Sequence, residues 1–192
     1  MKPDIKREVW RKVVQVIVGT GLIIGILRLT IIAGSSAVLW VLLGLLCGAL
    51  VLDQLMAVTR WRIPLYDHLR RPKERGTLHG PTWLLLGVLL SAVYYPLPVA
   101  LAAAGNVFFG DAAAAVVGML IRSPRLVGKK TLAGSTAMFF VSWASATVFT
   151  QNWHVAGLMA GVATIVELIS TNVDDNLLVP IVSGFIGYVM LG

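Results

Sequence analysis

Acidic and basic side chains within and beside apolar segments are the residues of this sequence best suited to chemistry. Asp111 lies inside a long apolar segment, where placing a carboxylate costs on the order of 3 kcal/mol. Four cations follow within the nine residues from Arg122 to Lys130, and such a cluster attracts several negative charges, most simply a polyphosphate. A buried acid beside a polyphosphate site indicates a divalent metal ion between them.

A second group of acids occurs nearer the carboxyl end of the chain. Glu167 lies near the end of an apolar segment, and Asp174 and Asp175 lie in the polar turn that follows. Crowded carboxylates repel one another unless a cation lies between them, and oxygen-only ligands favour magnesium over zinc. If packing brings this group to Asp111, we expect a magnesium site and metal-assisted phosphoryl or nucleotidyl transfer.

The sequence gives no sign of several other kinds of site. The three histidines have no metal-ligand spacing, and Cys47 is the only cysteine, which excludes an internal disulfide and a cysteine metal site. The segment 128–130 lacks the upstream glycine and the Ser or Thr of a Walker phosphate-binding loop. No nucleophile, base and orienting group form a triad, so covalent catalysis is not indicated.

The elements that must position these residues are membrane helices. Of 192 residues, 57% are hydrophobic and 13% are charged, and the mean hydropathy is +0.84, more than a soluble domain can bury. We therefore expect an all-α, polytopic membrane protein that forms one integral membrane domain over residues 1–192, with a catalytic core at about 60–185. The net charge of +7 lies in short loops between apolar runs, which indicates membrane orientation and not nucleic-acid binding.

Apolar runs predict about seven transmembrane helices. They cover residues 13–33, 37–59, 82–93, 98–121, 133–149, 155–170 and 177–191. With a cytoplasmic amino terminus, every Lys and Arg except Arg28 lies on or beside the cytoplasmic face, as the positive-inside rule demands. The loop at 60–80, the basic turn at 122–130 and the turn at 174–175 then share one side. We expect a polar cleft that opens to the cytoplasm.

Small residues within these spans predict close helix packing. Gly110, Ala114 and Gly118 recur every four residues, which allows a neighbouring helix to approach the backbone. Asp111 and Gly118, seven residues apart, share a helix face. Glycine-rich faces on short spans also favour a homodimer. Asp53, in the second apolar run, is read either as a hydrogen-bonding residue between helices or as a further functional acid.

Each of these features alone has a structural explanation. A membrane aspartate can serve only as a hydrogen-bonding group, a basic loop can serve only to orient the protein, and the residues 174–176 can cap the last helix. Their location on one face favours a common polar site. A small membrane transporter is a further alternative, because acidic residues within spans also serve as ion or proton sites.

Four ordered segments resemble the CTP-dependent polyprenol kinases, the family of dolichol, phytol and farnesol kinases, which is distantly similar to phosphatidate cytidylyltransferase. The segments are 70–81, 110–118, 130–135 and 174–180, with Glu167 upstream of the last. The phytol kinase branch looks closest, because Ala133 stands where dolichol kinases usually have Glu. The sequence differs from the family pattern at two places that bear on which lipid is used. Gln15 stands where many relatives carry a histidine, and the basic turn lacks the usual Gly-Arg-x-Gly pattern.

The resemblance implies that CTP from the cytoplasm and an isoprenoid alcohol from the bilayer, of the phytol, farnesol or polyprenol type, give an alkyl phosphate and CDP. It implies catalytic roles for Asp111, Glu167 and Asp175, and magnesium ligands at Asp111, Asp174 and Asp175. The nucleotide contacts that it implies are Lys129, Lys130, Gly134, Ser135, Arg70, Glu74 and Asn106. The main alternative is a CDP-lipid synthase, in which a lipid phosphate attacks the α-phosphorus of CTP.

Overall fold

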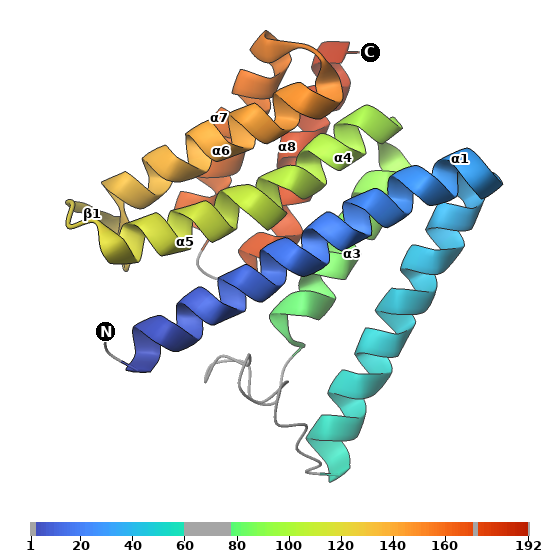
Figure 1. The fold of residues 1–192 in the computed structure, drawn as a ribbon, viewed down its shortest axis with the longest axis horizontal. Coiled ribbons are helices and arrows are strands. Elements are labelled where there is room, and N and C mark those ends of the chain that lie inside the picture. Colours follow the sequence, from blue (N-terminus) through green and yellow to red (C-terminus); the bar gives the residue numbers. More distant parts are fainter. Residues whose placement is uncertain (1–2, 60–77, 171–172, 192) are drawn as a thin grey trace.

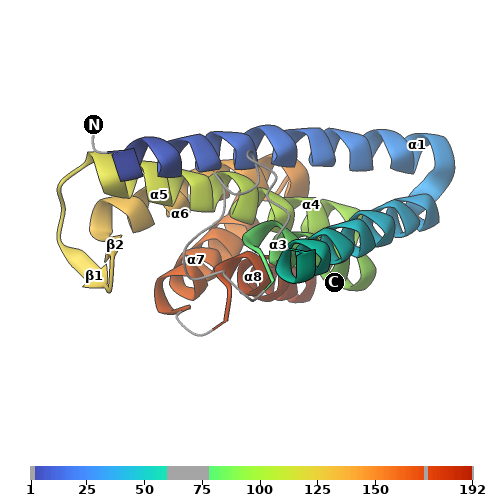
Figure 2. The same cartoon turned by 90° about the horizontal axis from the view of Figure 1, so that it is seen from below.

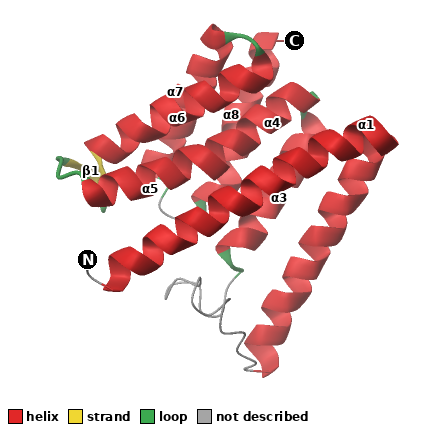
Figure 3. Ribbon diagram, in the orientation of Figure 1, coloured by secondary structure: helices red, strands yellow, loops and turns green. Residues whose placement is uncertain are grey.

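A computed structural model describes residues 3–59, 78–170 and 173–191, and in this part of the chain helices dominate (Figure 1, Figure 3). In chain order they are α1 (Pro3–Thr59), α3 (Gly80–Tyr94), α4 (Leu97–Gly105), the π-helix η2 (Asn106–Gly110), α5 (Asp111–Leu120), α6 (Leu132–Thr150), α7 (Trp153–Ile169) and α8 (Asp175–Leu191). The helical fold class is therefore confirmed.

The basic turn contains the strands of the described part of the chain. β1 (Arg125–Val127) and β2 (Lys130–Thr131) form a short antiparallel hairpin in which Arg125 pairs with Thr131 and Val127 with Lys130. Gly128, between the strands, has a φ of 55°, a backbone conformation that glycine adopts without steric cost. The basic turn predicted at 122–130 thus contains a β-hairpin, which gives Lys130 a fixed place.

Three of the described helices are long and apolar enough to cross a membrane. They are Ile5–Thr59, Leu97–Leu120 and Leu132–Thr150. α3, α7 and α8 are apolar but have 15 to 17 residues. The helices run back and forth between two ends of the bundle (Figure 1), which agrees with the order of the apolar runs. The number of spans and the cytoplasmic amino terminus stay predictions.

Gly34 divides α1 into two arms. Its φ of 81° and ψ of 171° are not helical, and the two arms turn away from each other there (Figure 1, Figure 2). The arms correspond to the runs predicted at 13–33 and 37–59. The first arm begins earlier than expected, at Pro3, so the polar residues before position 13 belong to a helix that packs on α5.

Replacing Gly34 with alanine is expected to lower the midpoint of thermal unfolding in detergent. Side chains rarely adopt the backbone angles of this residue, and holding one there costs on the order of 1–3 kcal/mol. Gly44→Ala is the matched control, because Gly44 is helical and has no other group within 4 Å of a new Cβ. The control is expected to gain about 0.5–1 kcal/mol. Equal midpoints for the two variants would contradict this explanation of the bend.

The continuous unit of α4, η2 and α5 lies at the centre of the bundle (Figure 1). Val107 and Phe108 are buried in it. Its small residues face α6: a Cβ at Gly110 would meet the Ser142 hydroxyl. One and two turns later, Ala114 and Gly118 lie against Gly134. The predicted close packing along this face is confirmed.

Asp53 joins the second arm of α1 to the start of α3. Its Oδ2 accepts hydrogen bonds from the His79 backbone N–H at 3.1 Å and from the Thr82 hydroxyl at 2.7 Å. All three residues are buried. A carboxylate that accepts from the residue before a helix and from its first turn acts as a cap. The geometry therefore supports the structural interpretation of Asp53.

Candidate active site

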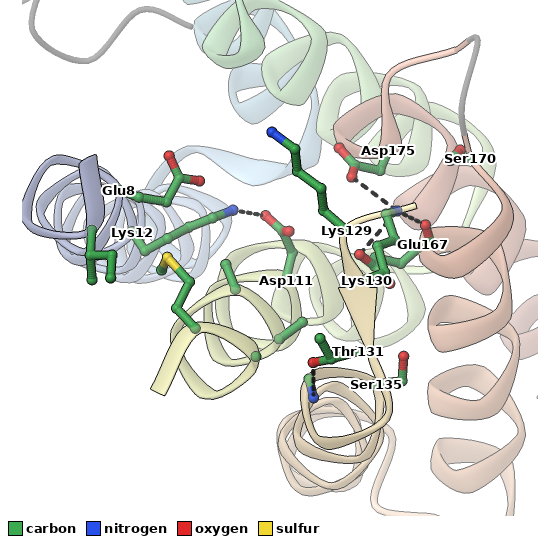
Figure 4. A pocket seen from close by; sticks show the side chains of 16 residues that line it. Glu8, Lys12, Asp111, Lys129, Lys130, Thr131, Ser135, Glu167, Ser170 and Asp175 are labelled. Carbon is green, nitrogen blue, oxygen red and sulfur yellow. Dashed lines mark hydrogen bonds and ion pairs between the residues drawn. The ribbon is translucent and has the colours of Figure 1, made fainter. Parts of the chain in front are cut away.

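A cavity of about 750 Å³ lies between the first arm of α1, α5, the strand β2 and the adjoining ends of α6, α7 and α8 (Figure 4). Seven residues predicted from the sequence line it: Asp111, Lys129, Lys130, Gly134, Ser135, Glu167 and Asp175. They come from four separate segments of the chain. The cavity therefore brings Asp111 together with Glu167, Asp175 and the lysines of the basic turn.

The π-helix η2 places Asp111 at the wall of this cavity. The Asp111 backbone N–H donates to the Asn106 carbonyl, five residues earlier. Such a widened turn is frequent at functional sites. The Asp111 side chain is 6% exposed, and its Oδ2 accepts from the Lys12 ammonium and, at 2.9 Å, from the Gln15 amide. The cost of burying this carboxylate is therefore offset by donors from α1.

Glu8 and Lys12 also line the cavity, and they are residues that sequence reasoning did not place in the site, whereas Gln15 was noted there only as a departure that bears on the lipid substrate. Positions 8, 12 and 15 share one helix face, but this signal is visible only if the helix is known to begin at Pro3. Lys12 precedes the apolar run directly, where a lysine ordinarily reaches back to the membrane surface. The cavity thus includes residues outside the interval 60–185.

Lys130 lies opposite Asp111, between two acids from different helices (Figure 4). Its Nζ is 3.0 Å from Glu167 Oε1 and 3.7 Å from Asp175 Oδ2, and it also donates to the Glu167 carbonyl. A cation between these carboxylates reduces their mutual repulsion. The hairpin, the end of α7 and the start of α8 are joined through this one side chain.

Lys129 differs from its neighbour Lys130. It is exposed and lines the cavity, and within the described residues no carboxylate forms an ion pair with it. Figure 4 shows its side chain extended into the space between Asp111 and Asp175. An ammonium in this position suits an anionic ligand.

The amino terminus of α6 forms another part of the wall. A helix amino terminus favours anions, but its first amides already have protein partners. Leu132 N–H donates to the Pro124 carbonyl, Ala133 N–H to Ser123 Oγ and Gly134 N–H to Thr131 Oγ1. The hydroxyls of Ser135 and Ser170 line the cavity and, in the described part of the chain, have no hydrogen-bond partner. These hydroxyls are better placed than the Gly134 amide to bind a ligand.

Gly134 itself allows α6 to approach α5. A Cβ there would lie 2.7 Å from the Ala114 carbonyl oxygen, and backbone cannot move aside as a flexible side chain can. Gly134→Ala is therefore expected to destabilise the fold by about 1–3 kcal/mol, seen as a lower unfolding midpoint in detergent. In the control Gly161→Ala the nearest atom, on Phe139, is 3.9 Å away. A midpoint for Gly134→Ala equal to that of the control would show that the helices can separate without cost.

Several predicted site residues lie elsewhere. Asn106 is fully buried and donates to Ser183 Oγ at 3.2 Å, and it does not line the cavity. Asp174 caps the start of α8, because its Oδ1 accepts from the Asn176 backbone N–H at 3.1 Å and side-chain amide at 2.8 Å. Arg70 and Glu74 fall outside the described residues.

Magnesium was expected at Asp111, Asp174 and Asp175. Among the described residues, no three His, Cys, Asp or Glu side chains are grouped so as to hold a metal ion. Glu167 and Asp175 nevertheless face one cation, Lys130. Magnesium in nucleotide sites is commonly held by one or two carboxylates together with the phosphates, so this donor pair fits a magnesium–nucleotide complex.

Comparisons with known proteins give one partial similarity. The chain is 39% identical over 83 residues to the CTP-dependent diacylglycerol kinase 1 of Eremothecium gossypii. The matched stretch covers 42% of this chain and 26% of that relative, so the chain spans about a quarter of the relative's length. No family model and no solved structure matches the chain.

Proposed function

We propose that this chain is a CTP-dependent lipid kinase, which transfers the γ-phosphoryl group of CTP to the hydroxyl of a membrane lipid alcohol and releases CDP. The observation that carries the proposal is the meeting of Asp111, Glu167 and Asp175 with two lysines in one cavity. The partial similarity to a CTP-dependent diacylglycerol kinase supports the same class of reaction. The apolar helices support a location in the membrane.

The lipid acceptor has two candidates of the same chemical class. The motif resemblance favours an isoprenoid alcohol of the phytol, farnesol or polyprenol type, whereas the name of the relative favours diacylglycerol. Both present a hydroxyl group near the surface of the bilayer. The common proposal is therefore a lipid hydroxyl as the phosphoryl acceptor.

The basic side of the cavity is the proposed phosphate site. Lys129 and Lys130 supply positive charge, and the Ser135 hydroxyl at the start of α6 supplies a donor. Arg70 and Glu74 remain nucleotide contacts proposed from the sequence alone. Magnesium held by Glu167 and Asp175 would neutralise charge on the phosphates. CTP would reach this side from the cytoplasm if the predicted orientation holds.

Asp111 is the proposed proton acceptor. The lipid hydroxyl oxygen forms a bond to the γ-phosphorus, the bond from this phosphorus to the β–γ bridging oxygen breaks, and CDP leaves. The hydroxyl proton passes to a carboxylate within hydrogen-bond reach. Asp111 suits this role because it lies across the cavity from Lys130 (Figure 4), and Glu167 is the alternative base.

A product assay on purified protein in detergent tests the proposal. The assay contains CTP and magnesium with diacylglycerol, phytol, farnesol, a longer polyprenol or phosphatidic acid. CDP together with a phosphorylated alcohol is expected, and the productive lipid identifies the acceptor. Pyrophosphate formed with phosphatidic acid would instead identify a CDP-lipid synthase. No product with any lipid would contradict both reactions and favour the transporter alternative.

A further inference from the structure

Lys12 has an unusual place for a lysine at the edge of an apolar run. Such a side chain ordinarily extends to the membrane surface and keeps its charge in water. Lys12 is instead 1% exposed, and its side chain crosses from α1 toward Asp111 (Figure 4). The two residues are separated by 99 positions in the sequence. Its location therefore calls for an explanation beyond membrane orientation.

Lys12 and Gln15 hold one oxygen of Asp111. Both side chains donate to Oδ2, and Lys12 Nζ also donates to Gln15 Oε1 at 3.1 Å. The Gln15 amide donates in addition to the Val107 carbonyl of η2 at 2.9 Å. The carboxylate is thus fixed by two donors from α1, one of which is tied to the backbone turn that precedes Asp111.

Stability alone does not explain such an arrangement. Apolar residues of similar volume often replace a buried ion pair without loss of stability, because removing two charges from water is costly. Both residues of the pair also line the cavity. Because Lys12 and Gln15 both donate to Oδ2, they fix the orientation of the Asp111 carboxylate at the cavity wall.

We propose that Lys12 is a positioning residue, which acts through Asp111 to orient this carboxylate for the lipid hydroxyl, with Gln15 as its neutral partner. This inference rests on the proposed function. It adds the first arm of α1 to the functional part of the chain. It also assigns the two lysines different roles: the half-buried Lys130 serves the nucleotide side, whereas the buried Lys12 serves the acceptor side.

The first test separates turnover from nucleotide binding. Lys12→Met is expected to lower kcat about 100-fold, which is within the range of acid–base contributions. The KM for CTP is expected to change less than about twofold, because the lost interaction is made only in the transition state. Lys12→Arg keeps the charge and is expected to recover part of kcat. Lys6→Met is the matched control, because Lys6 is an exposed lysine on the same helix, and it is expected to retain wild-type kcat.

A double-mutant cycle with Asp111→Asn tests whether Lys12 acts through Asp111. In the Asp111→Asn background, adding Lys12→Met is expected to cause no further fall in kcat, because the group that Lys12 positions is already gone. The unfolding midpoint is expected to fall in Lys12→Met, where Asp111 loses the lysine, and to recover in the double variant, which lacks both charges. If the double variant regains stability but not kcat, the loss of activity in Lys12→Met comes from the lost positioning of Asp111 and not from weakened packing.

Other results would overturn the inference. A rise of tenfold or more in KM for CTP would make Lys12 a nucleotide contact, and a normal kcat would make it structural. If Lys12→Met does not fold, Gln15→Leu removes the neutral donor to Oδ2, together with its bonds to Lys12 and the Val107 carbonyl, and is expected to lower kcat about tenfold. Normal kcat in that variant would also overturn the inference. Inactive wild-type protein contradicts the proposed function, whereas active wild type with an equally active Lys12→Met contradicts only the role of Lys12.

Discussion

Lipid phosphorylation is expected to fall by at least about 100-fold when Asp111 is replaced by asparagine, because the amide cannot accept the hydroxyl proton. The fold is expected to persist with a lower unfolding midpoint, since the amide oxygen of asparagine can still accept from Lys12 and Gln15 but the buried ammonium of Lys12 loses its counter-charge. The measurement is the rate of CDP formation at saturating CTP and lipid, with the unfolding midpoint in detergent as the check on folding. Near-normal activity would remove Asp111 from the chemistry.

Asp53→Asn is the matched control for this experiment. Both aspartates are buried and lie in apolar helices, but Asp53 caps α3 and does not line the cavity. The control is expected to keep most of its stability, because an asparagine oxygen can still accept from the His79 N–H and the Thr82 hydroxyl, and its kcat is expected to stay near wild type. Equal losses of kcat in the two variants would mean that the Asp111 effect is general destabilisation.

Replacing Lys130 with alanine is expected to give the second large effect. The change removes the cation between Glu167 and Asp175 and a proposed phosphate contact, so KM for CTP is expected to rise at least about tenfold, as for loss of a charged hydrogen bond. A fall in kcat and in the unfolding midpoint is expected with it, because the hairpin loses its link to α7 and α8. Titration with CTP and thermal unfolding measure these effects.

Lys129→Ala is the neighbouring comparison. Lys129 is exposed, and no carboxylate in the described part of the chain forms an ion pair with it. Replacing it is therefore expected to raise KM for CTP without lowering the unfolding midpoint. The difference in stability between the two variants reports the structural part of the Lys130 effect. Unchanged CTP binding in both variants would contradict the proposed phosphate site.

Features set by composition and short spacing were predictable from the sequence. Apolar runs indicate helices because a membrane leaves few other ways to satisfy backbone hydrogen bonds. The spacing of Gly110, Ala114 and Gly118 identified the face that packs on α6, because residues four apart lie on one side of a helix. Crowded acids were expected to need a cation, but the sequence predicted magnesium for them and assigned Lys130 to the phosphates, whereas Lys130 lies between Glu167 and Asp175.

Features that depend on long-range packing were not predictable. The pairing of Lys12 with Asp111 joins residues 99 positions apart, and no local pattern encodes this contact. Asn106 was expected to contact the nucleotide, but it lies at the start of the π-helix, buried in the core, and donates to Ser183. The hairpin depends on the backbone of Gly128, which a charge count over 122–130 does not reveal.

The distance in sequence between Lys12 and Asp111 also has a consequence during synthesis of the chain. At about 5–20 residues per second, the ribosome adds Asp111 roughly 5–20 s after Lys12. If the first arm of α1 spans the membrane as predicted, its lysine can stay in the headgroup region during this interval, when Asp111 has not yet been added. Docking of the first helix on α5 then waits for α5, and the proposed acceptor side of the cavity forms late in synthesis.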